Sequence, residues 1–479
     1  MIVLAYLLLI GMVIAGAWLA HRAEARIKIE TAVSTFEDTD YALPPVLVRT
    51  GTATLGFFII ILTLLLVTGV WVGLGIAVVL AFGVLRYGLF VQYRTGATVS
   101  SKTRASIAVQ KPEFADARFA FFLSAPDLIS PDHFNMWRDD LDALGLPWCA
   151  VFKEQKHLVV ARSTTDVPGI FVLPNDKLHA VLPIGVELVF YANNSQQNRR
   201  MMAAYPDKKH IQLLHGDSDK SPSFSPLTRN YDYVFVAGQM AIDRYTRNGI
   251  DIPDARFRIV GRPQVKAIEQ GAAETSPDIP CIVYMPTWRG FFEDTQFSSL
   301  DRATLILETI MSGEAPVRVV FKPHPMSYKD PDWKRFEKQI NAALSKRRSN
   351  GSTGAFAATD AQPFELYNQA DIMVTDISSV LIDFLYSEKP IVLIEPPKFD
   401  RAQTDNFPSL KASYMVDADL GNLTEMFEVA IGTDLLAPVR QEIKAYAFGD
   451  AGRVPGEAFR EVCLGLLAEA DERTGKGAL

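Results

Sequence analysis

The sequence of 479 residues contains little cysteine, and this limits the kinds of site that it can build. Its three cysteines, Cys149, Cys281 and Cys463, lie far apart, and none belongs to a C-x-x-C pair. Neither a disulfide framework nor a cysteine zinc site has enough ligands, which fits a reducing compartment. The sequence also lacks a P-loop, an H-E-x-x-H motif and a G-x-S-x-G motif. Nothing in it calls for a metal ion or another cofactor.

An excess of basic residues is absent as well. The chain has 48 Lys and Arg against 55 Asp and Glu, which gives a formal net charge of −7. Proteins that bind nucleic acid usually neutralise its phosphates with a basic surface, so nucleic acid is excluded as the main partner. Hydrophobic residues make up 48% of the chain and no residue type dominates, which is typical of a globular protein. The length allows two or three domains.

What the sequence does contain is two long stretches without a charged residue, 1–20 and 51–85. A helix that crosses a membrane needs about 20 apolar residues, so the first stretch predicts one transmembrane helix. The second stretch is nearly long enough for two helices, roughly 52–70 and 72–91, with a turn at the glycines around Trp71. A single long tilted helix is the alternative.

Basic residues flank these stretches and favour three helices. They are Arg22, Arg26, Lys28 and Arg49 between the stretches, and Arg94, Lys102 and Arg104 after the second. Positively charged flanks stay on the cytoplasmic side, and three helices put both flanks there. We therefore expect residues 1–92 to form an anchor of about three transmembrane helices in the cell membrane, with the rest of the chain in the cytoplasm.

The remaining residues alternate between short apolar runs and amphipathic segments, which predicts an α/β fold with parallel sheets covered by helices. The expected strands are 119–123, 148–152, 187–191, 211–214, 233–237, 256–260, 281–285, 317–321, 372–375 and 391–394. The clearest helices are 132–144, 239–248, 300–311, 332–344 and 379–386. A polar stretch at 266–280 is the best linker candidate, so we expect one domain at 93–265 and a second at 266–479. A second loose stretch, 346–354, is expected to be a surface loop.

Four of the predicted strands lead directly into polar segments. In open parallel sheets, ligands bind beyond the carboxyl ends of the strands, so these segments are expected to line one cleft. The segments are 215–220, 286–290, 322–325 and 375–379. The first belongs to the expected N-terminal domain and the other three to the C-terminal one.

Ser378 and Ser379 open an apolar helix directly after a strand, where free backbone N–H groups and the helix dipole favour an anion. Taken alone, an ordinary serine cap is the simpler interpretation. Arg289, Lys322 and His324 follow the other strands of the same domain and add cationic donors suited to phosphate oxygens. Considered together, these segments favour a diphosphate ligand.

His215 is the candidate for proton transfer. It follows an apolar strand and precedes Gly216, which would allow close approach of the backbone to a substrate. A histidine at this place could take a proton from an acceptor hydroxyl at neutral pH, although a histidine in a solvated turn is the alternative. Asp217 and Asp219 would repel an anion unless they bind a metal, orient His215 or contact acceptor hydroxyls. The sequence does not decide among these roles.

In these segments the sequence resembles the CDP-glycerol glycerophosphotransferase family, the teichoic-acid primases and polymerases. The similar motifs run in the family's order over roughly residues 211–394. They are His215-Gly216 with Lys220, Tyr231-Asp232-Tyr233, Gly261 with Pro263, Pro286-Thr287-Trp288-Arg289, Lys322-Pro323-His324-Pro325, Ala370-Asp371-Ile372, Thr375-Asp376-Ile377-Ser378-Ser379 and Asp383-Phe384. The resemblance departs from the family at Asp217-Ser218-Asp219, where Thr-Pro-Leu is usual, and at Gln264-Val265, where Arg and an acid are usual.

The resemblance implies a GT-B fold of two facing Rossmann-like domains and transfer of a polyol phosphate from a CDP-linked donor to a lipid-linked or polymeric hydroxyl. It implies that His215 is the base, with His324 as a second catalytic candidate at the diphosphate. The donor contacts that it implies are Arg289, Lys322, His324, Thr375, Ser378, Ser379 and Asp383. Residues expected on the acceptor side are Gly216, Asp217, Asp219 and Lys220.

Two other functions are compatible with these features. A GT-B glycosyltransferase that uses a sugar nucleotide would share the fold and the anion site. A membrane-anchored binding or assembly protein of the same fold would lack turnover, and the altered residues Asp217–Asp219 are the feature that favours it. Release of CMP from a CDP-linked donor distinguishes the predicted transferase from both.

Overall fold

The computed structural model describes residues 115–474 with gaps at 129, 172–177, 179–180, 220, 272–278, 291–296, 359–360, 397–398 and 450–452, together with Gly83 and Tyr87. The chain divides into two compact units. Unit 1 comprises Met1–Ala117 and Trp148–Ile184, and unit 2 comprises Arg118–Pro147 and Gly185–Leu479. All site residues predicted from the sequence fall in unit 2.

In unit 1 the structure describes a strand, a helix and a second strand. They are β2 (Trp148–Phe152), α5 (Gln155–Thr164) and β3 (Gly169–Phe171). The two strands pair in parallel, with Ala150 opposite Gly169. A Cβ atom on Gly169 would lie 2.7 Å from Leu158 Cδ1, so a side chain here would displace the Leu158 side chain of α5.

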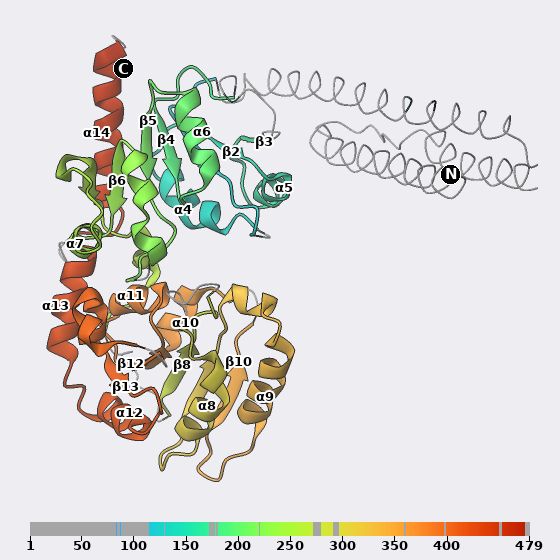
Figure 1. Cartoon of the computed structure of the whole chain (residues 1–479), viewed down its shortest axis with the longest axis vertical. Helices are drawn as coiled ribbons and strands as arrows, with labels where there is room; N and C mark the ends of the chain where they lie inside the picture. Colours follow the sequence, from blue (N-terminus) through green and yellow to red (C-terminus); the bar gives the residue numbers. More distant parts are fainter. Residues whose placement is uncertain are drawn as a thin grey trace, which may run out of the picture. The chain divides into compact units, whose positions relative to one another are not determined.

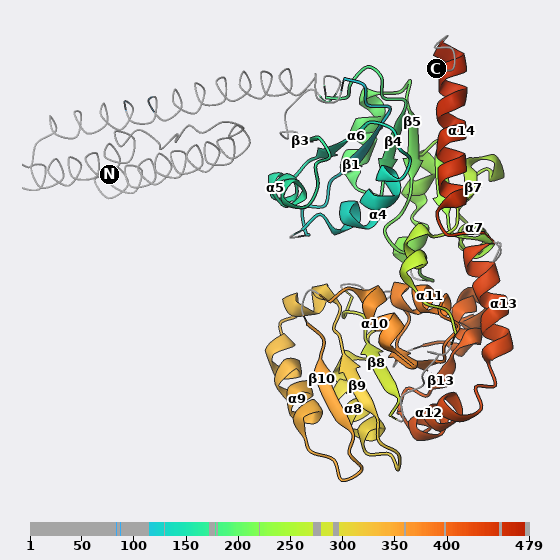
Figure 2. The same ribbon diagram turned by 180° about the vertical axis from the view of Figure 1, so that it is seen from behind.

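The first sheet of unit 2 is parallel and has the strand order β1-β4-β5-β6-β7. Its strands are β1 (Phe119–Leu123), β4 (Leu188–Tyr191), β5 (Lys209–Gln212), β6 (Tyr233–Val236) and β7 (Phe257–Ile259), and its helices are α4 (Asp132–Asp142), α6 (Gln196–Ala204) and α7 (Gln239–Arg247). The last helix that the structure describes, α14 (Glu457–Thr474), lies beside β5 in both views (Figures 1 and 2). Its Phe459 ring is 6.3 Å from that of Phe190 and 5.4 Å from that of Trp137, so the C-terminal helix covers this first sheet.

The second sheet is also parallel, in the order β10-β9-β8-β11-β12-β13. Its strands are β8 (Cys281–Met285), β9 (Arg318–Phe321), β10 (Thr353–Phe356), β11 (Ile372–Thr375), β12 (Ile391–Ile394) and β13 (Tyr414–Val416). Its helices are α8 (Ala303–Met311), α9 (Trp333–Ser345), α10 (Pro363–Gln369), α11 (Ser379–Leu385), α12 (Leu423–Gly432) and α13 (Ala437–Phe448). In chain order this is the 3-2-1-4-5-6 arrangement of a Rossmann sheet, whose order reverses between β8 and β11.

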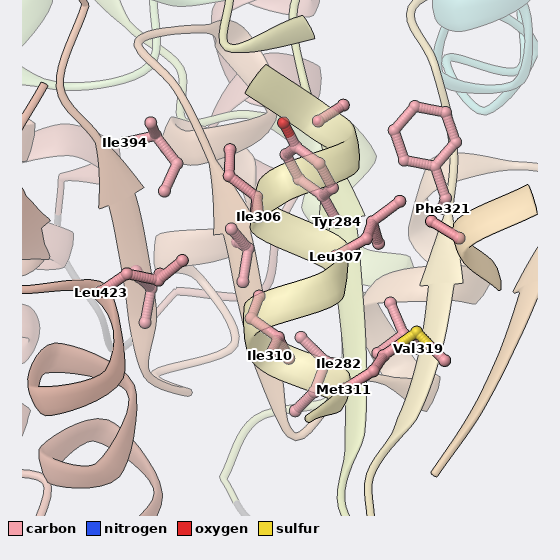
Figure 3. Close-up of a cluster of buried hydrophobic side chains, with 14 of the residues drawn as sticks. Ile282, Tyr284, Ile306, Leu307, Ile310, Met311, Val319, Phe321, Ile394 and Leu423 are labelled. Carbon is pink, nitrogen blue, oxygen red and sulfur yellow. The ribbon is translucent and has the colours of Figure 1, made fainter. Parts of the chain in front are cut away.

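Both faces of the second sheet are buried, as the apolar composition of its strands requires. Along β8, Ile282 and Tyr284 face one core while Cys281, Val283 and Met285 face the other. Figure 3 shows the first core, where the α8 side chains pack against the strands. They are Ile306, Leu307, Ile310 and Met311, whose spacing places them on one side of the helix. Helices therefore cover the sheet on both sides, and its carboxyl edge remains for ligands.

The predicted strands and helices agree with the structure to within two or three residues at most ends. The prediction missed β3, β10 and β13, which are strands of three or four residues. It was wrong in treating 346–354 wholly as a loop, because β10 begins at Thr353 and pairs with β9. A short strand at a sheet edge has too few residues to show a clear period. The domain boundaries at 92/93 and 265/266 stay predictions.

The predicted fold class needs a correction. The α/β part with two parallel sheets is present, but the transmembrane helices and the multi-pass membrane location are not supported. Over the part of the chain that the structure describes, no helix is both long and apolar enough to cross a membrane. The segments on which the prediction rested, 1–20 and 52–91, lie outside the described residues apart from Gly83 and Tyr87.

Candidate active site

The carboxyl ends of β8 and β11 meet where the strand order of the second sheet reverses, and this is where open α/β sheets bind ligands. Thr375, the last residue of β11, pairs with Met285, the last residue of β8. The segments that follow these strands are therefore neighbours, and they contain Thr287–Arg289 and Ser378–Ser379.

Buried hydrogen bonds hold these two segments together. The Thr375 hydroxyl donates to the Met285 carbonyl at 2.8 Å. One carboxylate oxygen of Asp376 accepts from the Thr287 backbone N–H at 2.9 Å, and the other accepts from the N–H and hydroxyl of Ser299 at 2.8 and 2.9 Å. Asp376 has no exposed surface, so it fixes the backbone of the site. The sequence prediction gave Asp376 no role, although its position directly after a buried strand was the available signal.

Ser378 and Ser379 lie at the start of α11. Ser378 occupies the N-cap position, but its hydroxyl donates to the Asp376 carbonyl at 3.2 Å and caps no N–H group of the helix. The simpler interpretation, an ordinary serine cap, therefore lacks its defining hydrogen bond. Ser378 is buried, whereas Ser379 is half-buried.

Arg289 is surrounded by carboxylates that the sequence prediction did not connect with it. Its guanidinium donates to both carboxylate oxygens of Asp330 at 2.7 and 2.6 Å, and to Asp332 at 2.8 Å. Asp301 Oδ1 lies 3.3 Å from Arg289 Nη1. These hydrogen bonds, above all those to Asp330, raise the pKa of Arg289, and they lower the pKa of Asp330 below its usual 3.8. Arg289 is therefore firmly oriented, and its charge is balanced within the protein.

His324 has a defined tautomer. Its Nδ1 accepts a hydrogen bond from the Met326 backbone N–H at 3.1 Å, so in the neutral ring the hydrogen is on Nε2. Its ring lies 6.4 Å from that of Trp288, which follows β8. Lys322, which follows β9, is half-buried, and its backbone N–H donates to the Tyr284 carbonyl at 3.0 Å. A histidine with hydrogen on Nε2 is suited to donate to a phosphate oxygen.

His215 has the opposite tautomer. Its Nδ1 lies 2.8 Å from the Ala192 carbonyl, which only accepts, so Nδ1 carries the hydrogen and Nε2 of the neutral ring has a lone pair. The ring stacks on that of His133 at a centroid distance of 3.9 Å. The residue is exposed to solvent, yet the protein packed around its imidazole lowers its pKa below 6.5, and the nearby charge of Arg262 adds to this effect. These contacts therefore favour a neutral His215 ring with its lone pair on Nε2. The sequence prediction did not identify His133.

Gly216 brings the His215 loop against the start of α11. A Cβ atom built on Gly216 would lie 3.3 Å from Ser379 Cβ and 3.6 Å from Ser379 Oγ. Two segments that are far apart in sequence and follow strands of different sheets thus touch at this point.

Replacing Gly216 by alanine tests this contact. The new methyl group is slightly too close to Ser379, so the loop or the helix start must shift by a few tenths of an ångström. Because small misplacements of reacting groups slow catalysis strongly, we expect Gly216→Ala to lower turnover about tenfold or more with little loss of stability. Gly465→Ala, at an exposed position of α14 where an added Cβ atom would meet nothing within 4 Å, is the neutral control and should leave turnover unchanged. Unchanged turnover in Gly216→Ala would show that this contact has no bearing on activity.

Asp217 and Asp219 face the interior of the protein. Both are buried, and both pair with Arg244 of α7, which has no exposed surface. The other oxygen of Asp219 accepts from the Ser409 hydroxyl at 2.6 Å. Of the three roles that the sequence left open, these contacts favour orientation of His215 through its loop. Lys220 lies outside the described residues.

Asp383 pairs with Arg262, a residue to which the sequence prediction assigned no role. Arg262 Nη2 donates to Asp383 Oδ2 at 3.0 Å, and Nε lies 2.5 Å from Oδ1. Burial raises the pKa of Asp383, while the charge of Arg262 opposes that effect. Only 6% of each residue is exposed. The ion pair therefore joins α11 to the Arg262 segment in the protein interior.

The structure thus separates the predicted residues into two groups. The strand-end segments with His215, Gly216, Ser378 and Ser379 lie around one contact, whereas Asp217, Asp219 and Asp383 are paired with buried arginines. Within the described ranges, no group of three or more His, Cys, Asp or Glu residues could hold a metal ion.

These features define an α/β protein with two parallel sheets and polar residues gathered at the carboxyl ends of their strands. Residues 192–400 match the family model described as CDP-glycerol:poly(glycerophosphate) glycerophosphotransferase. The match confirms the resemblance seen in the sequence, and the enzyme class that it indicates is a transferase. Every described candidate residue lies within the matched region.

Solved structures are similar in fold. A protein described as a UDP-N-acetylglucosamine 2-epimerase from Listeria monocytogenes aligns with a TM-score of 0.50 and 12% identity, over 74% of this chain and 97% of that one. A structure of the wall teichoic acid polymerase TagF aligns with a TM-score of 0.48 and 12% identity, over 78% of this chain and 94% of that one. No curated protein matches the chain in sequence.

Proposed function

We propose that this protein transfers glycerol phosphate, or a similar polyol phosphate, from a CDP-linked donor to a hydroxyl group of a polymeric or lipid-linked acceptor in cell-envelope polymer synthesis. The observation that carries the proposal is the contact between Gly216 and Ser379 inside the region that matches the family. It brings the loop of a neutral histidine base next to the strand ends at which a diphosphate is expected to bind.

In the proposed reaction, the acceptor oxygen attacks the β-phosphorus of the donor. The new bond joins that oxygen to phosphorus, the bond to the bridging oxygen breaks, and CMP leaves with that oxygen. His215 Nε2 takes the proton of the acceptor hydroxyl. Phosphoryl transfer depends mainly on positioning and charge stabilisation, which Arg289, Lys322 and the Nε2–H group of His324 would supply.

The donor half of the site is tested by three separate substitutions. Arg289→Ala, His324→Ala and Ser379→Ala should each weaken binding of CDP-glycerol by about 1–3 kcal/mol, as expected for loss of a hydrogen bond to a charged group. Calorimetric titration measures the change. Arg335→Ala removes an exposed cation that pairs with Asp332, so it is a matched control and should leave the affinity unchanged. If none of the three variants bound the donor more weakly, the donor site would lie elsewhere.

The reaction itself is tested by product analysis with the purified chain. CDP-glycerol, CDP-ribitol and UDP-sugars are offered with a teichoic-acid oligomer as acceptor, and the released nucleotide is identified. We expect CMP, with the acceptor longer by one polyol phosphate. Release of UDP would instead indicate a glycosyltransferase, and binding without turnover would indicate a protein that only binds.

A further inference from the structure

The loop that carries His215 is fixed at almost every residue. Leu214 adopts a left-handed backbone conformation with φ of 59°, which residues with a side chain rarely adopt. Its carbonyl accepts from the Trp137 indole N–H at 2.7 Å, and its N–H donates to the Gln212 side chain at 3.0 Å. Such a conformation persists only where its surroundings hold it in place.

On the other side of His215, a buried arginine holds the loop. Arg244 donates through Nη1 to Asp217, and through Nε and Nη2 to one oxygen of Asp219 at 3.2 and 3.1 Å. Between the two carboxylates, the Ser218 hydroxyl lies 2.9 Å from that of Ser223. The planar guanidinium thus binds two loop residues at once, in an arrangement that a lysine could not reproduce.

Asp219 also ties the loop to a segment that packs with the second sheet. Its second oxygen accepts from the Ser409 hydroxyl at 2.6 Å, and Ser409 belongs to the 3-10 helix Pro408–Ala412. Neighbouring residues of that helix, Leu410 and Ala412, are part of the core beneath α11. Arg244 and Ser409 therefore fix the loop on the side that touches Ser379.

From these contacts we propose that Arg244 is a positioning residue for His215, which acts by holding the Leu214–Asp219 loop through its two carboxylates. The proposal rests on the proposed function, in which His215 is the base. It explains why this chain has acidic residues where the family it resembles usually has Thr-Pro-Leu: the two carboxylates are the partners of a buried cation. Burial of Arg244 without them would be strongly unfavourable.

Arg244→Lys is the central variant, and Arg440→Lys is its matched control. Arg440 also has no exposed surface, and it binds Asp434 and the Glu388 carbonyl. We expect Arg244→Lys to lower kcat at least tenfold with the donor Kd within twofold of wild type. Arg440→Lys should keep kcat within twofold. In a His215→Ala background, Arg244→Lys should cause no further loss of turnover, because a positioning residue acts through the residue that it positions.

Two further measurements cover the cases in which this comparison fails. If Arg244→Lys does not fold, Ser409→Ala removes only the bond to Asp219 and should lower kcat two- to fivefold. The rate at which diethyl pyrocarbonate modifies His215, followed by mass spectrometry, needs no turnover. It should change at least threefold in Arg244→Lys, or in Ser409→Ala, but not in Arg440→Lys.

The outcomes separate the two proposals. A wild-type protein without turnover of CDP-linked donors would overturn the proposed function, while an altered modification rate of His215 would still support the anchoring of its loop by Arg244. A wild-type protein with turnover, together with unchanged kcat and unchanged His215 modification in the variants, would overturn the positioning role alone. The positioning role would also be overturned if Arg244→Lys lowered turnover further in the His215→Ala background.

Discussion

Replacement of His215 by alanine should lower turnover by about 10²–10⁴-fold, the usual contribution of a general base. Binding of the donor should remain within about twofold, because the residues proposed to hold the diphosphate follow strands of the other sheet. Steady-state release of CMP measures the first effect, and titration with CDP-glycerol measures the second. His215→Gln keeps a polar side chain of similar size but has no basic nitrogen, so it should be as inactive as the alanine variant.

The pH profile gives this prediction a second test. The protein around the ring and the charge of Arg262 lower the pKa of His215 below 6.5, while the Ala192 carbonyl opposes them. A general base must be unprotonated, so the midpoint of the acid limb of kcat/KM should lie below pH 6.5. The His133 ring stacks on that of His215, so the profile of His133→Gln serves as the control. Full turnover in His215→Ala would rule out the proposed mechanism.

Replacement of Asp383 by alanine should lower the free energy of unfolding by about 3–5 kcal/mol, since it leaves the buried Arg262 without its partner. The two residues form a buried ion pair with one hydrogen bond, and each is 6% exposed. Urea denaturation measures the loss. Removing both charges, as in Arg262→Met with Asp383→Leu, should restore most of the stability, because no uncompensated charge then remains buried.

Asp301→Ala is the control for this experiment. Asp301 also pairs with an arginine, Arg289, but its side chain is 58% exposed, so its loss should cost less than about 1 kcal/mol. The resemblance to the family implies that Asp383 contacts the donor. If Asp383→Ala weakened donor binding and left the urea midpoint unchanged, a direct role in binding would be supported and the structural role would be wrong.

Much of the fold follows from local pattern in the sequence. Runs such as Phe119–Leu123 and Cys281–Met285 are apolar throughout, which is typical of strands buried on both faces, and the structure has strands with these bounds. The helix at 379–386 was predicted from its apolar face after two serines and is observed as Ser379–Leu385. These features depend on neighbours within a few residues, so no tertiary information is needed to predict them.

The site was predictable only in part. The rule that ligands bind at the carboxyl ends of parallel strands selects His215, Arg289 and Ser378 from the whole chain. The rule does not show what each side chain contacts. Arg289 is held by Asp330, which lies 41 residues further along the chain. The residues around Arg289 in the sequence therefore do not reveal this contact.

By itself, the sequence determined the class of the protein: parallel α/β sheets, polar strand ends and the motifs that match the glycerophosphotransferase family model. Only the tertiary structure decided which charges are buried together. Arg244 binds Asp217, which is 27 residues away in the sequence, and Arg262 binds Asp383, which is 121 residues away. No local sequence pattern predicts either pair. The physical reason is that secondary structure depends on hydrogen bonds and apolar faces of short segments, whereas the partner of a buried charge depends on how whole elements pack.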